Sequence, residues 1–212
     1  MKYGPDKWDE RYGVDKYVYG KAPNLFLKEN FKVIPTGNVL CVADGEGRNG
    51  VWLAKNGYNV TSIDFSPKAV EKTNRLAKEN NVSIKTICHD LLNYDFGENK
   101  YNGIVAIFGH FKIDEINKLH SKYFKALKQN GVFFMEVFAK EQIQLNTGGP
   151  KNIELLYNIE DIRNSFPNGN IELLKKDIVF LHEGDLHDGK AVVVRAIIRK
   201  PSGKENLNEI KN

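Results

Sequence analysis

Long apolar runs are missing from this 212-residue chain, and none reaches the roughly 20 residues that a membrane-spanning helix needs. The N-terminal stretch MKYGPDKWDERYG also lacks the apolar core of a secretion signal. These absences predict a cytoplasmic protein without a membrane partner. At this length we expect one α/β domain, large enough to fold without a disulfide or a metal ion.

Cysteine is scarce, with two residues, Cys41 and Cys88. Both lie in apolar runs that predict the first and third strands of one sheet, with a second strand between them. Adjacent strands are about 4.8 Å apart, so the two thiols would be about 10 Å apart, beyond the reach of a disulfide. We therefore expect two reduced cysteines in the core.

Charge of one sign is not concentrated anywhere. Lys and Arg number 31 against 27 Asp and Glu, and the net charge of +4 is spread along the chain. A nucleic-acid partner would favour a basic face or tail, and neither is present in the sequence. We therefore expect no nucleic-acid partner.

The strongest pattern lies at 38–64. An apolar run at 39–43 ends at Asp44 and opens into a glycine turn; a helical segment and a second apolar run follow, ending at Asp64. In a parallel α/β sheet, ligands bind at such strand tips, and glycines let the backbone approach them closely. Asp64 is placed to accept hydrogen bonds from ribose hydroxyls, which predicts a nucleoside cofactor. The glycines are Gly45, Gly47 and Gly50.

Apolar runs and amphipathic segments alternate along the rest of the chain. Two long β-runs near the C-terminus, separated by a glycine-containing turn, predict a hairpin. The expected architecture is five β/α units followed by this hairpin. Predicted helices cover 25–31, 67–80 (with Val70, Thr73 and Ala77 inside), 116 to the Asn130-Gly131 turn, and 159–166. Predicted strands cover 39–43, 60–63, 83–88, 103–108, 132–138, 171–181 and 190–199.

Two kinds of nucleoside cofactor are consistent with this pattern. The glycines satisfy G-x-G-x-x-G, and Asp64 follows about 20 residues on, as a dinucleotide site expects. Asp44, however, would repel a pyrophosphate but attract a cationic amine, and the second mononucleotide half of a dinucleotide fold is missing. Asp90, after the third strand, can accept from an adenine amino group. S-adenosylmethionine offers an ammonium, a sulfonium, a ribose diol and an adenine, and fits better.

Several motifs resemble one family, the class I S-adenosylmethionine-dependent methyltransferases, and within it the small-molecule branch that includes tellurite-resistance methyltransferases. The resemblance runs over about 8–201. It is carried by WDERY (8–12), YGKAPN (19–24), ADGEGRNGVWLA (43–54), SIDFSPKAV (62–70), FGH (108–110), TGGPK (147–151) and EGDLHDGKAVVVR (183–195).

This resemblance implies a Rossmann-like, seven-stranded, mostly parallel sheet with helices on both faces and a C-terminal antiparallel β-hairpin. The chain is expected to divide into an aromatic-rich N-terminal cap (1–37), a class I methyltransferase domain (38–200) and a polar tail (201–212). The aromatic-rich stretch either folds over the ligand as a flap or pads the edge of the sheet. The resemblance assigns the methionine portion to Asp44, Gly45 and Gly47, the ribose to Asp64, and the adenine to Asp90 and Leu91. Phe65, Trp8 and Tyr12 complete the expected cofactor-binding residues.

The acceptor is expected to be a small molecule, with a soft nucleophile such as a thiol or a chalcogen oxyanion favoured because it needs no strong base. A hydroxyl or amine acceptor would need one, and His110 is the candidate catalytic residue. His187 is expected as a lid residue. Lys151 of the TGGPK loop could serve an oxyanion; Arg11 and Arg48 either meet the cofactor carboxylate or lie on the surface.

Four alternatives compete with this interpretation. A metal site at His182, Asp185 and His187 lacks a fourth ligand at a recognisable spacing, so no metal is expected. An NAD(P)-dependent oxidoreductase is disfavoured because the tyrosines at 94, 101, 123 and 157 have no lysine four positions on to form a Tyr-x-x-x-Lys dyad. A nucleic-acid methyltransferase usually shows an (Asn/Asp)-Pro-Pro-(Tyr/Phe) motif after strand four, and 108–111 reads FGHF instead. A non-catalytic protein that only binds the cofactor would keep the same glycine turn.

Overall fold

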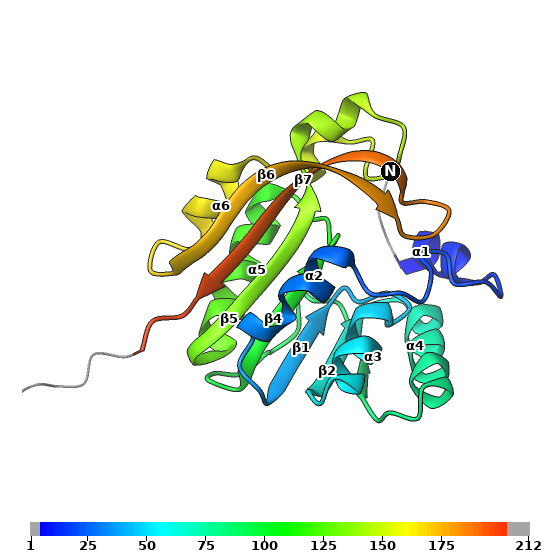
Figure 1. Cartoon of the computed structure of the whole chain (residues 1–212), viewed down its shortest axis with the longest axis horizontal. Coiled ribbons are helices and arrows are strands. Elements are labelled where there is room, and N and C mark those ends of the chain that lie inside the picture. The colour runs from blue at the N-terminus through cyan, green and yellow to red at the C-terminus, as the bar shows by residue number, and fades with distance from the viewer. Residues whose placement is uncertain (1–4, 203–212) are drawn as a thin grey trace, which may run out of the picture.

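The computed structural model describes residues 5–202, and in this part of the chain seven strands form one sheet in the order β3-β2-β1-β4-β5-β7-β6 (Figure 1). Neighbours are parallel except at β7, which runs antiparallel to β5 and β6. The predicted sheet with its C-terminal hairpin is therefore confirmed. The strands are β1 (Asn38–Val42), β2 (Asn59–Asp64), β3 (Lys85–Cys88), β4 (Tyr101–Ile107), β5 (Leu127–Phe138), β6 (Asn170–His182) and β7 (Asp188–Arg199).

Helices cover both faces of the sheet (Figure 1). On one face, Phe26, Leu27 and Leu53 of the helices pack on Val105 and Phe134 of the strands. The opposite face buries a second apolar cluster beneath α5 and α6. The helices are α1 (Pro5–Tyr12), α2 (Leu25–Asn30), α3 (Arg48–Lys55), α4 (Pro67–Glu79), α5 (Ile113–Ala126) and α6 (Ile159–Ser165), with short 3₁₀ turns η1 (Phe31–Val33), η2 (Lys140–Gln144) and η3 (Ile153–Leu155). Among the described residues, no helix has both the length and the apolar character needed to cross a membrane.

The local signals at the helix ends are confirmed. The side chain of Asn24 accepts from the Leu27 N–H to cap α2, and Ser66 accepts from the Ala69 N–H to cap α4, with Pro67 in its first turn. Gly57 follows α3 with φ +89°, a left-handed conformation that closes a helix at little steric cost.

Three expectations about the elements are wrong. Helix α5 ends at Ala126, because Leu127 is already extended and pairs with Tyr101 of β4. The Asn130-Gly131 turn therefore lies inside β5, where it exchanges backbone hydrogen bonds with Lys200. No helix follows β3 either, since 89–100 contains only turns and irregular backbone, so there are four β/α units before the hairpin.

Two burial expectations also fail. Cys41 is buried, but Cys88 is exposed because β3 is the edge strand of the sheet. In α4 the inner face includes Thr73 and Ala77 as expected, whereas Val70 is half-buried and Lys72 is buried instead. Of the predicted polar tail, Pro201 and Ser202 are exposed, and the rest lies outside the described residues.

One buried side chain in the core carries an ionisable group without a partner. His120 of α5 is fully buried against Phe133 and Phe166, and neither ring nitrogen has a hydrogen-bond partner among the described residues. Burial lowers the pKa of His120 to about 3. Between about pH 6.5 and pH 3, therefore, the folded protein keeps this imidazole neutral while the unfolded chain would protonate it.

We predict that His120 makes the protein less stable as the pH falls. Between about pH 6.5 and pH 3 the unfolded state binds a proton that the folded state refuses, so the free energy of unfolding decreases by up to about 1.4 kcal/mol per pH unit. Urea denaturation at pH 7.5 and pH 5 measures how much the free energy of unfolding decreases between these two pH values. We expect this decrease to be about 2 kcal/mol smaller in His120→Leu than in wild type. The same substitution at the exposed His182 is the control; an equal loss in wild type and His120→Leu would contradict the prediction.

Candidate cofactor and acceptor site

A cavity of about 880 Å³ opens at the carboxyl ends of β1, β2 and β4. Its wall is completed by the N-terminal segment, the TGGPK loop and the hairpin turn between β6 and β7. Of the predicted site residues, all except Gly47 line it. They are Trp8, Tyr12, Asp44, Gly45, Asp64, Phe65, Asp90, Leu91, His110 and His187.

The glycine turn is tied to the tip of β2 by one carboxylate. Asp64 accepts from the Gly45 N–H at 2.9 Å with one oxygen and from the Ser66 N–H at 3.0 Å with the other. Gly45 has φ +58°, and a Cβ there would lie 2.9 Å from the Tyr12 hydroxyl. Gly47 instead faces Thr73 of α4, so its missing side chain serves helix packing and not the cavity.

Two buried acids face the cavity beside this turn. Asp44 accepts from the Ser62 hydroxyl at 2.8 Å, and a Cβ on Gly50 would lie 2.5 Å from its Oδ2. Burial raises the pKa of Asp44 to about 7, although the Ser62 hydrogen bond opposes the rise. Burial likewise raises the pKa of Asp64 to about 6, against its backbone hydrogen bonds. Both groups therefore titrate close to neutrality, where a cationic ligand would favour their charged forms.

The predicted adenine residues lie at the mouth of the cavity. Leu91 is buried, whereas Asp90 is exposed and its oxygens accept from the Leu92 N–H at 2.9 Å and the Asn93 side chain at 2.7 Å. Asp95 repeats this turn five residues later, accepting from the Gly97 N–H at 2.9 Å, but it does not line the cavity.

Aromatic side chains of the N-terminal segment cover the glycine turn. Trp8 and Tyr12 of α1 stack with ring centroids 5.6 Å apart, and Tyr12 is buried over Gly45. Arg11 lies 4.5 Å from the centre of the Trp8 ring and donates to the Tyr19 hydroxyl at 2.8 Å. Helix α1 is held in place by the Ser66 hydroxyl, which donates to Asp9.

The two candidate histidines share one aromatic neighbour, Phe138. His110 donates from Nδ1 to the Leu155 carbonyl oxygen at 3.1 Å, and burial lowers its pKa to about 3. His187 is buried among the rings of Tyr19, Phe108 and Phe138, and burial lowers its pKa as well. Neither side chain is a strong base in this surrounding.

The hairpin residues considered for a metal site, His182, Asp185 and His187, contact different partners. His182 is exposed and pairs with Asp188 at 2.8 Å, and Asp185 pairs with Lys16. The TGGPK loop does line the cavity, but the Lys151 ammonium donates to the Leu145 carbonyl and the Asn146 side chain.

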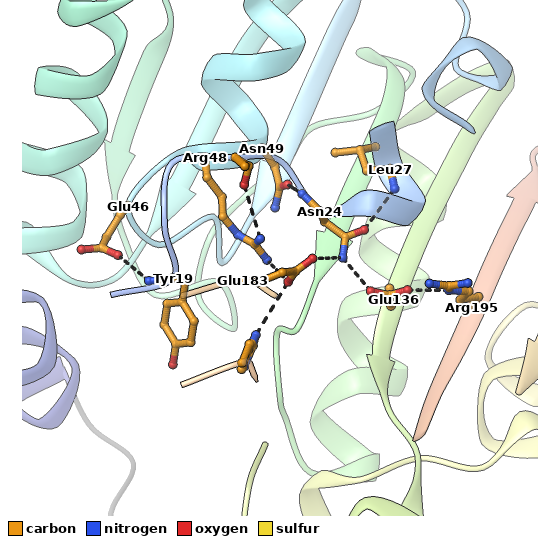
Figure 2. A network of polar contacts seen from close by, with 11 residues as sticks. Tyr19, Asn24, Leu27, Glu46, Arg48, Asn49, Glu136, Glu183 and Arg195 are labelled. Atoms are coloured by element: carbon orange, nitrogen blue, oxygen red, sulfur yellow. Dashed lines mark hydrogen bonds and ion pairs between the residues drawn. The ribbon is translucent and has the colours of Figure 1, made fainter. Parts of the chain in front are cut away.

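Sequence reasoning missed a buried polar network behind the cavity (Figure 2). Asn24 donates to Glu136 at 2.6 Å and to Glu183 at 2.9 Å. Each carboxylate also meets an arginine: Arg195 lies 2.5 Å from Glu136, and Arg48 lies 2.7 Å from Glu183. Arg48 is thus buried and paired within the chain, so the expectation of a surface position is wrong.

A second buried pair fixes the N-terminal segment to the glycine turn. Glu46 accepts from the Val18 N–H at 2.8 Å, from the Tyr19 N–H at 3.3 Å and from the Lys72 ammonium at 2.7 Å. No local pattern marks these acids as buried, because their partners lie far away in sequence: 26 residues separate Lys72 from Glu46 and 159 separate Asn24 from Glu183.

Comparisons with known proteins agree with this geometry. Residues 39–131 match the family model described as a methyltransferase domain. The glycine/sarcosine N-methyltransferase of Parasynechococcus marenigrum is 27% identical over 137 residues, covering 62% of this chain and 48% of that protein. The probable S-adenosyl-L-methionine-dependent methyltransferase TehB of Haemophilus influenzae is 34% identical over 71 residues, covering 31% of this chain and 25% of TehB. The chain thus spans about half, or less, of these curated relatives.

Solved structures share the fold over nearly the whole chain. The structure of TehB from Haemophilus influenzae has a TM-score of 0.70 at 17% identity, covering 92% of this chain and 66% of that one. A structure from work on the conversion of a disulfide bond into a thioacetal group during echinomycin biosynthesis has a TM-score of 0.78 at 15% identity, covering 95% and 93%. At these low sequence identities, the structural similarity is evidence for the fold alone.

Together these findings confirm the predicted resemblance to the class I S-adenosylmethionine-dependent methyltransferases: residues 39–131 match a methyltransferase domain, and the Haemophilus influenzae relative is named for S-adenosyl-L-methionine. The residues of the cavity fit this cofactor. Two buried acids with raised pKa values suit a ligand that carries an ammonium and a ribose diol, and a glycine without Cβ lies between them.

We predict that the affinity for S-adenosylhomocysteine, which carries the same ammonium group, decreases as the pH falls below 7. Asp44 has a raised pKa of about 7 in the free protein, and a bound ammonium favours its carboxylate, so binding must release a proton at lower pH. Calorimetric titration should show a roughly tenfold weaker affinity at pH 6 than at pH 7.5. Asp44→Asn should flatten this dependence; an equally steep dependence in that variant would contradict the assignment.

We predict that Asp90→Ala weakens S-adenosylhomocysteine binding about three- to tenfold, the loss expected for one hydrogen bond. Asp95→Ala removes an equivalent turn hydrogen bond outside the cavity and should leave the affinity unchanged. Equal effects of the two substitutions would show that Asp90 acts only through its turn.

Proposed function

We propose that this chain transfers the methyl group of S-adenosylmethionine to a small-molecule acceptor, with a soft nucleophile such as a thiol or a chalcogen oxyanion favoured. The observation that carries the proposal is the chemistry of the cavity. Its acidic side, at Asp44 and Asp64, suits the cofactor, and its two histidines are uncharged and weakly basic. A hydroxyl acceptor would need a stronger base than His110 with a pKa of about 3.

The cofactor, when bound, supplies an electrophilic methyl carbon on its sulfonium. We assign the ammonium to Asp44, the ribose diol to Asp64 and the adenine edge to Asp90 and Leu91. Gly45 gives the methionine portion room beside Tyr12, because a Cβ would fill that space.

The chain itself contributes position and exclusion of water. The aromatic cap, at Trp8, Tyr12 and Tyr19, closes one side of the cavity, and the hairpin turn with His187 closes another. We name the part lined by Tyr19, Arg48, Phe108, His110 and His187 the acceptor wall. Its rings and neutral imidazoles offer an acceptor a dry surface, in which a nucleophile is more reactive than in water.

A small acceptor is supported by enclosure, since three separate segments cover the cavity. An amine acceptor is the second candidate, because one relative is named for glycine and sarcosine. In this chain an amine would have to arrive uncharged, since neither histidine can hold its proton firmly. A dinucleotide oxidoreductase is disfavoured by Asp44, which would repel a pyrophosphate.

The test is turnover of methyl-labelled S-adenosylmethionine against thiols, selenite and tellurite, amines and phenols. We expect label in thiol or chalcogen products and none in phenols. His110→Phe should keep thiol methylation within about threefold, because a group with so low a pKa accepts no proton at pH 7. Label in phenols that disappears in His110→Phe would overturn the soft-acceptor assignment. Binding of S-adenosylhomocysteine without any labelled product would favour a protein that only binds the cofactor.

A further inference from the structure

Arg48 is the one buried cation in the wall of the cavity among the residues that the structure describes. The other buried charged residues of the wall are acids: Asp44, Glu46 and Asp64. Lysines and Arg11 also line the cavity, but they lie nearer to solvent. An unpaired guanidinium at this depth would attract any anion that entered, because a buried charge is poorly screened.

The Glu183 carboxylate, which lies behind the cavity wall, neutralises the positive charge of Arg48. The Arg48 guanidinium lies 2.7 Å from Glu183 Oε2, and both side chains are 8% exposed. Glu183 itself does not line the cavity. Burial alone would raise the pKa of Glu183, but the neighbouring His187 and Arg48 outweigh burial and hold it at about 2, so the carboxylate is ionised.

The network fixes Glu183 in the position where it meets Arg48 (Figure 2). Asn24 donates to its other oxygen at 2.9 Å and to Glu136 at 2.6 Å, and Glu136 is satisfied in turn by Arg195. The Asn24 amide thus joins two ion pairs, Arg48 with Glu183 and Arg195 with Glu136, and Arg195 also meets Asp177 at 3.1 Å. The second buried wall residue near Tyr19, Glu46, is neutralised in the same way by Lys72, which also lies behind the wall.

We propose that Glu183 is a specificity-determining residue, which neutralises Arg48 so that the acceptor wall selects an uncharged acceptor, such as a thiol in its protonated form, over an anion. This inference rests on the proposed function and narrows its acceptor class to uncharged soft nucleophiles, so that chalcogen oxyanions are disfavoured. When a thiol that entered protonated is methylated, the sulfonium–methyl bond breaks, the new sulfur–methyl bond forms and the thiol proton is released to solvent water. An anion at this wall would lose its hydration without gaining a free cation, whereas a neutral molecule packs against the Tyr19, Phe108 and His187 rings at little cost.

The experiment compares benzyl mercaptan, uncharged at pH 7, with thiobenzoate, an anion of similar size. Binding to the protein saturated with S-adenosylhomocysteine is measured by calorimetry for wild type, Glu183→Gln and the double variant Arg48→Met/Glu183→Gln. We expect wild type to prefer benzyl mercaptan. Glu183→Gln leaves Arg48 uncompensated and should bind thiobenzoate at least about tenfold more tightly than wild type does, with benzyl mercaptan within threefold. The double variant should return to the wild-type preference.

Three outcomes would overturn the inference. Wild type could prefer thiobenzoate, the double variant could keep the gain, or Glu183→Gln could change the affinity for S-adenosylhomocysteine alone, which would place Arg48 on the cofactor. If Glu183→Gln does not fold, as thermal melting would show, the double variant alone tests the inference. Removing both members of a pair without net charge should leave the preference for benzyl mercaptan over thiobenzoate unchanged, so a tenfold change in that preference would contradict it. Failure of the proposed function looks different, because labelled methyl would then reach neither thiol in any variant while S-adenosylhomocysteine still bound.

Discussion

The hydrogen bonds that converge on the Asp64 carboxylate hold the site together. Its two oxygens fix the Gly45 N–H, in the turn after β1, and the Ser66 N–H, at the start of α4. Three elements therefore meet at one buried side chain at the carboxyl edge of the sheet. The cost of burying this carboxylate is visible in its raised pKa, and the two backbone donors offset part of that cost. The Ser62 hydroxyl, which donates to Asp44 at 2.8 Å, ties the same turn to β2 a second time.

The covering segments depend on a different kind of contact. The N-terminal segment is held by buried carboxylates of other elements, Glu46 on one side and Glu136 with Glu183 on the other. Such pairs contribute little net stability, because desolvation offsets most of their attraction, but a missing partner leaves a costly buried charge. Their effect is specificity of position, since only one placement of the segment satisfies every group at once.

Patterns within about 30 residues sufficed to predict the sheet, the glycine turn and its two acids, because hydrophobic periodicity and turn chemistry are local signals. The position of Cys88 could not be read in the same way, since its apolar run says nothing about which strand lies at the edge. The Asn130-Gly131 turn looked like a helix end because its true partner, Lys200, is 70 residues away. Arg48 could equally meet the cofactor or lie on the surface, and Glu136 and Glu183 drew no prediction, because nothing beside these residues in sequence indicates burial.

The shared amide of Asn24 has a consequence for the synthesis of the protein. Glu183 is made 159 residues after its partner Asn24, and Arg195, which satisfies Glu136, is made later still. Closing so long a loop is entropically unfavourable and is repaid only when the whole network forms. A nascent chain can therefore assemble β1 to β5 while Asn24 still lacks its partner on the hairpin, and the cavity is enclosed only after β6 and β7 have been made.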